Sequence, residues 1–377
     1  MAKVSVLVTG STGEVGTHVV YFLARSGMIS HLYLLAKSAG KVANTLHNAR
    51  VITMMSGHSM QIEPVECDIL NVEMTSEKLR KVEPTLVINC AALLSLYPFF
   101  PFLKKRQARM GFIAGFAHTL PKDMALLWPL MKAIKSAIPG ALVVNLAAPD
   151  MGNAILKAIS LSPTTGAGTI DSTVQGLRLA IMRRRNIAPR SLDIRMVCHH
   201  ALRRFAPGEV PFILRIYYNG SDITEQFDHK ELIQEAADVS GVETMRTPVT
   251  NNAAITAASA VTIACTLLSE SRTLRHAAGV SGQVGGFPVS IGNRDVEIVL
   301  PDGVSMDEAK QVNVKGMKMS GVDHIQPDGT VVFTERERFW IREGLGLDWE
   351  IMRLEDARFM SDELTAAYKS MRREESS

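Results

Sequence analysis

Apolar residues in the first 150 positions fall into short, β-branched runs separated by longer segments with helical spacing. The helical segments include residues 17–25 and a stretch around 124–137. Strands separated by helix-length segments predict a parallel sheet with right-handed crossovers, so we expect an α/β unit here. The predicted strands lie at 4–9, 31–36, a run ending near 65–67, 86–91 and 141–146.

The pattern changes after about residue 160. Short strands are predicted at 195–198, 211–218 and 296–300, and they are interleaved with long helices at 171–185 and 250–268. This arrangement predicts a second, largely antiparallel α+β unit. The tail from residue 335 is charged and has helical spacing. We therefore expect three parts, at 1–160, 161–334 and 335–377.

Composition narrows the classes of protein. With 377 residues, 46% hydrophobic and 21% charged, the chain can bury a large core and is not disordered. Its net charge of +3 argues against nucleic-acid binding. The longest uncharged apolar run, 253–268, is too short and polar to span a bilayer, and we expect no signal segment because the first residues predict a strand. The cysteines lie far apart, which indicates a reducing cytoplasm: Cys67, Cys90, Cys198 and Cys265.

A glycine-rich turn follows the first predicted strand directly, with Gly10, Gly13 and Gly16 before a predicted helix. Such glycines let backbone N–H groups approach a pyrophosphate at a helix N-terminus. We therefore predict a Rossmann-type dinucleotide-binding unit, the alternative being a tight turn without a ligand. The predicted cofactor-binding residues here are Gly10, Ser11, Thr12, Gly13, Glu14, Val15 and Gly16, with Ala91 and Ala92 after the fourth strand.

The end of the second strand bears on the choice of nicotinamide cofactor. Sheets that bind NAD usually place an Asp or Glu there to bind the adenosine ribose. This chain has Ala36, Lys37 and Ser38 instead, so a cation and a hydroxyl replace the carboxylate. The pattern favours NADP(H) over NAD(H), unless Lys37 is only a solvated loop residue.

Residues 166–200 contain a Gly-x-Gly turn, Asp171 at a helix start, Pro189, a strand and His200. This order resembles the lactate/malate dehydrogenase superfamily, as do LVINCAA at the fourth strand, VVNLAAP at the fifth and the ribbon GGFPVSIGNRDVEIVL. The resemblance implies a C-terminal α+β domain of that type and a proton-transfer dyad of His200 and Asp171. A slip of one residue would assign the histidine's role to His199.

Several positions depart from the family pattern. Val174 stands where the family has its substrate-carboxylate arginine, and Ala148 replaces a substrate-orienting asparagine. Arg178, one helical turn on, and Asn251 are candidate substrate-binding residues, although Asn251 also suits a helix N-cap. The lid after the fourth strand is long and aromatic, and its polarising cation has four candidates: Lys104, Lys105, Arg106, which we take as the representative, and Arg109.

These features predict an NADP(H)-dependent oxidoreductase that transfers a hydride between nicotinamide and a hydroxyl/carbonyl substrate other than simple lactate or malate. Its expected partners are a small-molecule substrate and copies of itself in a homodimer or homotetramer, with no nucleic acid or membrane. One alternative is an enzyme similar to family 4 glycosidases, which use NAD and a metal, although we predict no metal. Another is a non-catalytic dinucleotide-binding protein.

Overall fold

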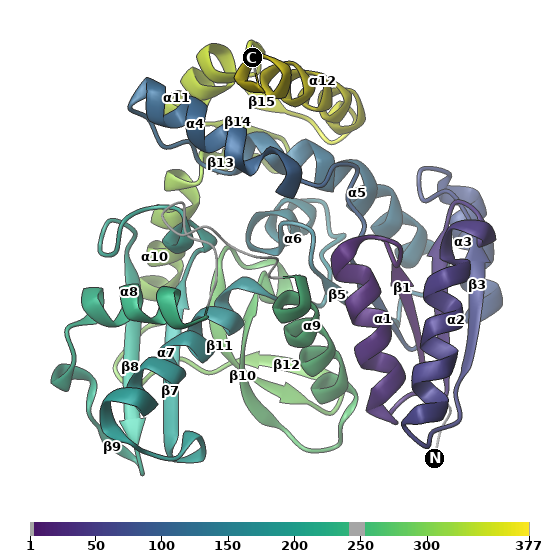
Figure 1. Ribbon diagram of the computed structural model, residues 1–377, viewed down its shortest axis with the longest axis horizontal. Coiled ribbons are helices and arrows are strands. Elements are labelled where there is room, and N and C mark those ends of the chain that lie inside the picture. Colours follow the sequence, from purple (N-terminus) through teal and green to yellow (C-terminus); the bar gives the residue numbers. More distant parts are fainter. Residues whose placement is uncertain (1–3, 241–252, 377) are drawn as a thin grey trace.

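A computed structural model describes residues 4–240 and 253–376 of the chain (Figure 1). Its first sheet is parallel, with the order β3-β2-β1-β4-β5-β6. The strand order reverses between β1 and β4, which opens a crevice at the carboxyl ends of these strands. The strands are β1 (Ser5–Thr9), β2 (His31–Ala36), β3 (Gln61–Glu66), β4 (Leu86–Asn89), β5 (Leu142–Asn145) and β6 (Thr165–Gly166).

Helices cover both faces of this sheet because its strands are apolar on both sides. Helix α1 buries Val19, Val20 and Leu23 against the strands and packs against α9 from the second unit. On the other face, α5 packs against α3. The helices are α1 (Glu14–Ser26), α2 (Ala39–Met55), α3 (Val72–Val82), α4 (Phe100–Met110), α5 (Leu120–Ala137) and α6 (Pro149–Ala158).

The second unit is built on an antiparallel sheet with the order β10-β11-β7-β8-β9, and β12 pairs with β11. Its strands are β7 (Leu192–Cys198), β8 (Phe212–Tyr218), β9 (Ser221–Asp222), β10 (Thr273–Ala278), β11 (Gly286–Gly292) and β12 (Asp295–Ile298). Its helices are α7 (Thr169–Arg185), α8 (His229–Ser240), α9 (Ala253–Leu268) and α10 (Met306–Met319). This confirms the predicted fold class, a parallel unit followed by an α+β unit.

The C-terminal part packs across α4 and α5, at the top of Figure 1. A small antiparallel sheet spans the boundary that we expected at 334/335, because its strands pair residues 322–325 with 331–333 and then with 351–352. The elements are β13 (Val322–Ile325), β14 (Val331–Phe333), α11 (Glu335–Phe339), the π-helix η7 (Trp340–Gly344), β15 (Ile351–Met352) and α12 (Ala357–Ser376). Trp340 and Tyr368 are fully buried, so this part shares a core with the first unit.

Short 3-10 helices join these elements: η1 (Tyr97–Phe99), η2 (Ala117–Thr119), η3 (Pro189–Ser191), η4 (His200–Arg203), η5 (Thr224–Gln226) and η6 (Val280–Gly282).

A row of buried polar side chains stabilises the strand ends beneath the crevice. Thr9 donates to Asn89, at 2.6 Å, and the Asn89 amide donates to Asn145 Oδ1, at 2.9 Å. Asn145 donates in turn to Asn153, at 2.8 Å, and Asn153 donates to the carbonyl of Gly279, at 3.0 Å. Because each buried amide has a partner, the row fixes β1, β4, β5 and α6 relative to the second unit.

Candidate functional site

A cavity of about 400 Å³ lies at the carboxyl ends of β1, β4 and β5. We call it the strand-end cavity. Its walls come from the glycine turn, from the loops after β4 and β5, and from the segment after β7. This is the position at which open α/β sheets bind ligands. Its lining residues include Gly13, Cys90, Ala92, Ala148, Asp150 and His200.

The glycine turn is shaped by close backbone packing. Gly10 has a φ of +65°, and a Cβ at Gly16 would lie 2.1 Å from the carbonyl oxygen of Gly10. The backbone N–H of Gly13 donates to Gly10 O, at 3.0 Å, and α1 begins at the next residue. Larger side chains at Gly10 or Gly16 would therefore displace the N-terminus of α1 from the strand ends.

Not all of the predicted cofactor residues reach this cavity. Ser11 and Ala91 are buried beside the turn, and Thr12 is exposed. Glu14 begins α1 and lines the cavity, so it lies close to the helix N-terminus at which a pyrophosphate would bind. The predicted residues that line the cavity are Gly13, Glu14, Val15, Gly16 and Ala92.

Ala36 ends β2, and Lys37 and Ser38 lead into α2, as predicted. Lys37 Nζ lies 2.9 Å from Asp68 Oδ2, and more than half of its side chain is exposed. Glu66 accepts a hydrogen bond from the N–H of Ala39 in the first turn of α2, at 3.0 Å. Two carboxylates thus occupy the region in which a 2′-phosphate would meet Lys37.

Of the two neighbouring histidines, His200 lines the strand-end cavity. Its backbone N–H donates to Asp150 Oδ1, at 3.1 Å, and its ring meets the Phe116 ring edge-on, with centroids 4.9 Å apart. His199 is fully buried, and its Nδ1 accepts from the N–H of Ala201, at 3.1 Å. The chain turns into η4 at residue 200, so strand alternation no longer decides which side chain faces the cavity.

The expected hydrogen bond between Asp171 and His200 is not formed. The Asp171 carboxylate accepts from Ser259 Oγ on α9, at 2.7 Å, and from Gln175 on its own helix, at 3.3 Å. Serine and glutamine donors thus take the place that the resemblance gave to an imidazole. Burial raises the pKa of Asp171. The catalytic roles of Asp171 and His200 stay predictions.

Asp150, in the first turn of α6, is the carboxyl group beside His200. It is 3% exposed, and its Oδ2 has no hydrogen-bond partner among the described residues. Burial raises the pKa of Asp150 to about 6, although the backbone N–H of His200 opposes this shift. Burial, together with Arg203, lowers the pKa of His200 to about 3. Of these two groups, Asp150 has the pKa nearer to neutral pH. A pKa near the working pH is the property required of a general acid or base.

The structure places three of the four candidate lid cations, Lys105, Arg106 and Arg109, in contact with the C-terminal helix α12. Arg106 is bound by Glu374 and Glu375 of α12 and donates to the carbonyl of Gly344, at 3.0 Å. Lys105 and Arg109 also bind Glu375. These side chains therefore hold the lid helix α4 to the C-terminal helix, instead of reaching the strand-end cavity.

The other two predicted substrate-binding residues are Arg178 and Asn251. Arg178 donates to the backbone carbonyls of Pro189, at 2.7 Å, and Leu192, at 2.6 Å, so it braces the second unit. It does not line the strand-end cavity. Asn251 lies outside the described residues. The structure thus gives no support to the prediction that Arg178 substitutes for the arginine missing at Val174, which stays a prediction.

Three other cations line the strand-end cavity, and the sequence analysis missed them. Lys122 pairs with Asp123, at 2.6 Å, and Arg203 and Arg204 follow His200. Arg204 donates to the carbonyl of Ala114, at 2.8 Å, and its guanidinium lies 4.8 Å from the centre of the Phe116 ring. For Arg203 and Arg204, the only available signal was their closeness in sequence to His200, and Lys122 had no such signal.

Among the described residues, no group of three His, Cys, Asp or Glu side chains is arranged to hold a metal ion. In the same part of the chain, no helix combines the length and the apolar character needed to cross a membrane.

Comparison with known proteins agrees with this geometry. Residues 6–99 match the NAD dependent epimerase/dehydratase family. No curated protein matches the chain in sequence. Among solved structures, Cryptosporidium parvum malate dehydrogenase aligns with a TM-score of 0.58 at 17% identity, over 84% of this chain and 96% of that one. The chain has the lactate/malate dehydrogenase fold.

Two further structures have the same architecture. Lactate dehydrogenase from Cryptosporidium parvum, complexed with lactic acid and nicotinamide adenine dinucleotide, has a TM-score of 0.58 at 16% identity, over 85% of this chain and 98% of that one. Malate dehydrogenase from Plasmodium falciparum, in complex with NADH, has a TM-score of 0.59 at 13% identity, over 84% of this chain and 96% of that one. The resemblance expected from the sequence is thus confirmed at the level of the fold.

Proposed function

We propose that this chain is an NADP(H)-dependent oxidoreductase acting on a hydroxyl/carbonyl pair. The observation that carries the proposal is the strand-end cavity, which is lined both by the glycine turn and by His200 and Asp150. A dinucleotide bound at the N-terminus of α1 would extend along the strand ends toward these two side chains. The matched epimerase/dehydratase family is NAD dependent, and two of the similar structures contain NAD or NADH, which supports this class of cofactor.

The preference for NADP(H) rests on Lys37. A 2′-phosphate would have to displace Asp68 from the Lys37 ammonium, and this ion pair is exposed, so the exchange costs little. One charge-assisted contact contributes roughly 1.5–3 kcal/mol, or about ten- to a hundredfold in affinity. Ser38 lies at the N-cap of α2 and adds a hydroxyl to the same region.

The cofactor, when bound, supplies or accepts the hydride. The protein must then give a proton to the substrate oxygen as the carbonyl π bond breaks, or take one from the hydroxyl in the reverse direction. Asp150 holds that proton, because its pKa of about 6 lets both forms exist near neutral pH. The neutral imidazole of His200 orients the substrate oxygen by a hydrogen bond. Lys122 and Arg203 supply positive charge at the same wall.

The deciding experiment measures binding and turnover separately. Titration of the purified protein with NADPH and NADH, followed by cofactor fluorescence, should show tighter binding of NADPH. A screen of carbonyl compounds should then reveal oxidation of NADPH by at least one class. His200→Ala should lower that turnover by about 10²–10³-fold, as expected for the loss of one hydrogen bond to the reacting oxygen, and leave cofactor affinity nearly unchanged. Equal binding of both cofactors would contradict the NADP(H) preference.

A second candidate is a dinucleotide-binding protein without catalysis. It is favoured by one observation, that Asp171 binds Ser259 and Gln175 instead of His200. NADPH binding with no turnover across the carbonyl screen, in either direction of hydride transfer, would support this candidate over the enzyme.

A further inference from the structure

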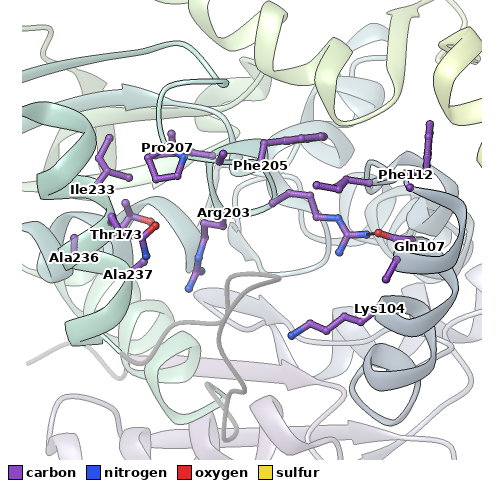
Figure 2. Close-up of a pocket in the computed structure, with 17 residues that line it drawn as sticks. Lys104, Gln107, Phe112, Thr173, Arg203, Phe205, Pro207, Ile233, Ala236 and Ala237 are labelled. Atoms are coloured by element: carbon purple, nitrogen blue, oxygen red, sulfur yellow. Dashed lines mark hydrogen bonds between the residues drawn. The ribbon is translucent and has the colours of Figure 1, made fainter.

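A second cavity, of about 490 Å³, lies between the lid helix α4 and helix α8 (Figure 2). We call it the α4–α8 cavity. Lys104 and Gln107 of α4 border it on one side, and Ile233 and Ala236 of α8 border it on the other. Phe205 and Pro207 lie between the two helices in Figure 2. Its walls are mostly apolar, as in cavities that bind small organic molecules.

The two cavities meet at Arg203 and Arg204, which line both of them. Arg204 is 6% exposed and is held by Ala114 and by Gln107 Oε1, at 3.1 Å. A molecule with one end beside His200 and its other end between α4 and α8 would therefore pass this arginine pair. Guanidinium groups bind carboxylates and similar anions well, because their N–H groups match two oxygens at once.

Gln107 gives a second, independent indication of a ligand. Its side chain is 2% exposed and lines the α4–α8 cavity. The carbonyl oxygen of this amide accepts from Arg204 and from the N–H of Ala114, but Nε2 has no partner among the described residues. A buried amide donor without a partner costs free energy, and a ligand oxygen in the cavity would satisfy it.

The wall formed by α4 is fixed from behind. Arg106 and Arg109 bind Glu375, whose side chain is fully buried, so the C-terminal helix α12 holds α4 in place. The α4 side of the cavity is thus a packed wall that needs no closing lid to form it.

We propose that the α4–α8 cavity binds the apolar part of the substrate, and that the substrate is an organic anion with a long or bulky apolar chain. Its anionic group lies at Arg203, its reacting carbonyl or hydroxyl lies beside His200 and Asp150, and Gln107 donates to an oxygen on the chain. Only the placement of the reacting carbonyl or hydroxyl rests on the proposed oxidoreductase function. The binding of an apolar chain in the α4–α8 cavity does not depend on it.

A chain-length series tests this assignment. Pyruvate, 2-oxohexanoate and 2-oxodecanoate are offered with NADPH, and anilinonaphthalene sulfonate serves as a fluorescent probe of the cavity. Each methylene that enters an apolar cavity should raise kcat/KM by about three- to fourfold until the cavity is filled. Ile233→Trp fills the cavity and should lower kcat/KM for 2-oxodecanoate and the affinity for the probe by about tenfold or more, while pyruvate is unaffected.

Two variants guard against misfolding. Leu179→Trp, at an exposed position of α7, is the matched control and should change nothing. Ile233→Ala should keep the fold and reduce the gain per methylene, which covers the case in which Ile233→Trp does not fold. Gln107→Met should weaken, about fivefold or more, the binding of a 2-oxo acid whose chain carries an ether oxygen, and it should leave the binding of 2-oxodecanoate nearly unchanged.

The outcomes separate the two proposals. Turnover that is independent of chain length and of both Ile233 variants would overturn the cavity assignment and leave the oxidoreductase proposal standing. Absence of turnover with every acid would count against the oxidoreductase proposal. If 2-oxodecanoate still displaced the probe, and Ile233→Trp still abolished probe binding, the cavity assignment would be supported.

Discussion

Asp150 and His200 differ in charge at neutral pH because burial acts on them in opposite directions. Burial disfavours the charged form of either group, so it raises the pKa of the Asp150 carboxyl to about 6 and lowers that of the His200 imidazole to about 3. His200 is therefore neutral, and Asp150 is the group that changes its charge between pH 5 and 7. The pH dependence of any proton transfer in the cavity should therefore reflect the protonation state of Asp150.

Carbonyl reduction should consequently fall as the pH rises through about 6, because the reaction needs protonated Asp150. Hydroxyl oxidation should rise over the same interval, since it needs the carboxylate. Asp150→Asn should lower turnover by about 10²–10⁴-fold and abolish this pH dependence. Asp302→Asn, at an exposed position, is the control. An unchanged pH profile of kcat/KM in Asp150→Asn would assign the proton to another group.

The proposed preference for NADP(H) also depends on single residues. Ala36→Asp combined with Lys37→Ile should reverse the preference from NADPH to NADH, because the new carboxylate binds the ribose and repels the phosphate. Asp68→Asn should tighten NADPH binding several-fold by removing the competing partner of Lys37. Calorimetric titration of both cofactors measures this, and a variant that binds NADH no better than the parent protein would contradict it.

Individual residues could be predicted from the sequence only where a local motif marks them. Gly10, Gly13 and Gly16 are recognisable because strand, turn and helix are contiguous. Asp150 went unnoticed because its importance comes from His200, which is 50 positions away in sequence. The hydrogen bond from Ser259 to Asp171 could not be predicted either, because Ser259 lies on a helix 88 positions away in sequence.

At the scale of elements, the segment after α4 is fixed by the C-terminal part. Glu337 of α11 is fully buried and accepts from the backbone N–H groups of Gly115, at 2.9 Å, and His118, at 3.0 Å. It also binds the His118 ring, at 2.6 Å, while the other ring nitrogen lies 2.9 Å from the Tyr368 hydroxyl. This network places Phe116 against His200, so it connects the C-terminal helices to the strand-end cavity.

Glu337→Ala should therefore destabilise the protein by about 3–5 kcal/mol, because it leaves buried donors without a partner. Tyr368→Phe removes one hydrogen bond and should cost about 1 kcal/mol. Urea denaturation measures both, with Glu343→Ala at an exposed ion pair as the control. A loss in Glu337→Ala no larger than in the control would show that the network does not stabilise the fold.

At the scale of the whole molecule, the parallel sheet was predictable and the C-terminal packing was not. The alternation of strands and helices indicated each strand of the first unit up to β5, because each of them except β3 is mostly a continuous apolar run. The attachment of α12 to α4 joins residues that are more than 260 positions apart, and no local pattern reveals such contacts. Without a sign of these contacts in the sequence, Arg106 and its neighbours on α4 were expected to bind the substrate.

The molecule as a whole should lose stability in mild acid. His199, His200 and His276 have a pKa lowered to about 3 by burial, whereas an unfolded histidine titrates near pH 6.5. Below pH 6.5 the unfolded chain therefore binds more protons at these residues than the folded chain does. Their contribution to the free energy of unfolding thus decreases as the pH is lowered. Asp150 acts in the opposite sense, because its pKa is raised in the fold, but three histidines outweigh it.

The free energy of unfolding should thus decrease by on the order of 1–3 kcal/mol per pH unit between pH 6.5 and 5. His276→Gln keeps an acceptor for the backbone N–H of Met196 and removes one titrating ring, so it should make this slope shallower. His47→Gln, on the exposed face of α2, should leave the slope unchanged. Urea midpoints measured across this interval decide the matter: a constant midpoint would mean that the buried histidines titrate alike in the folded and unfolded chains.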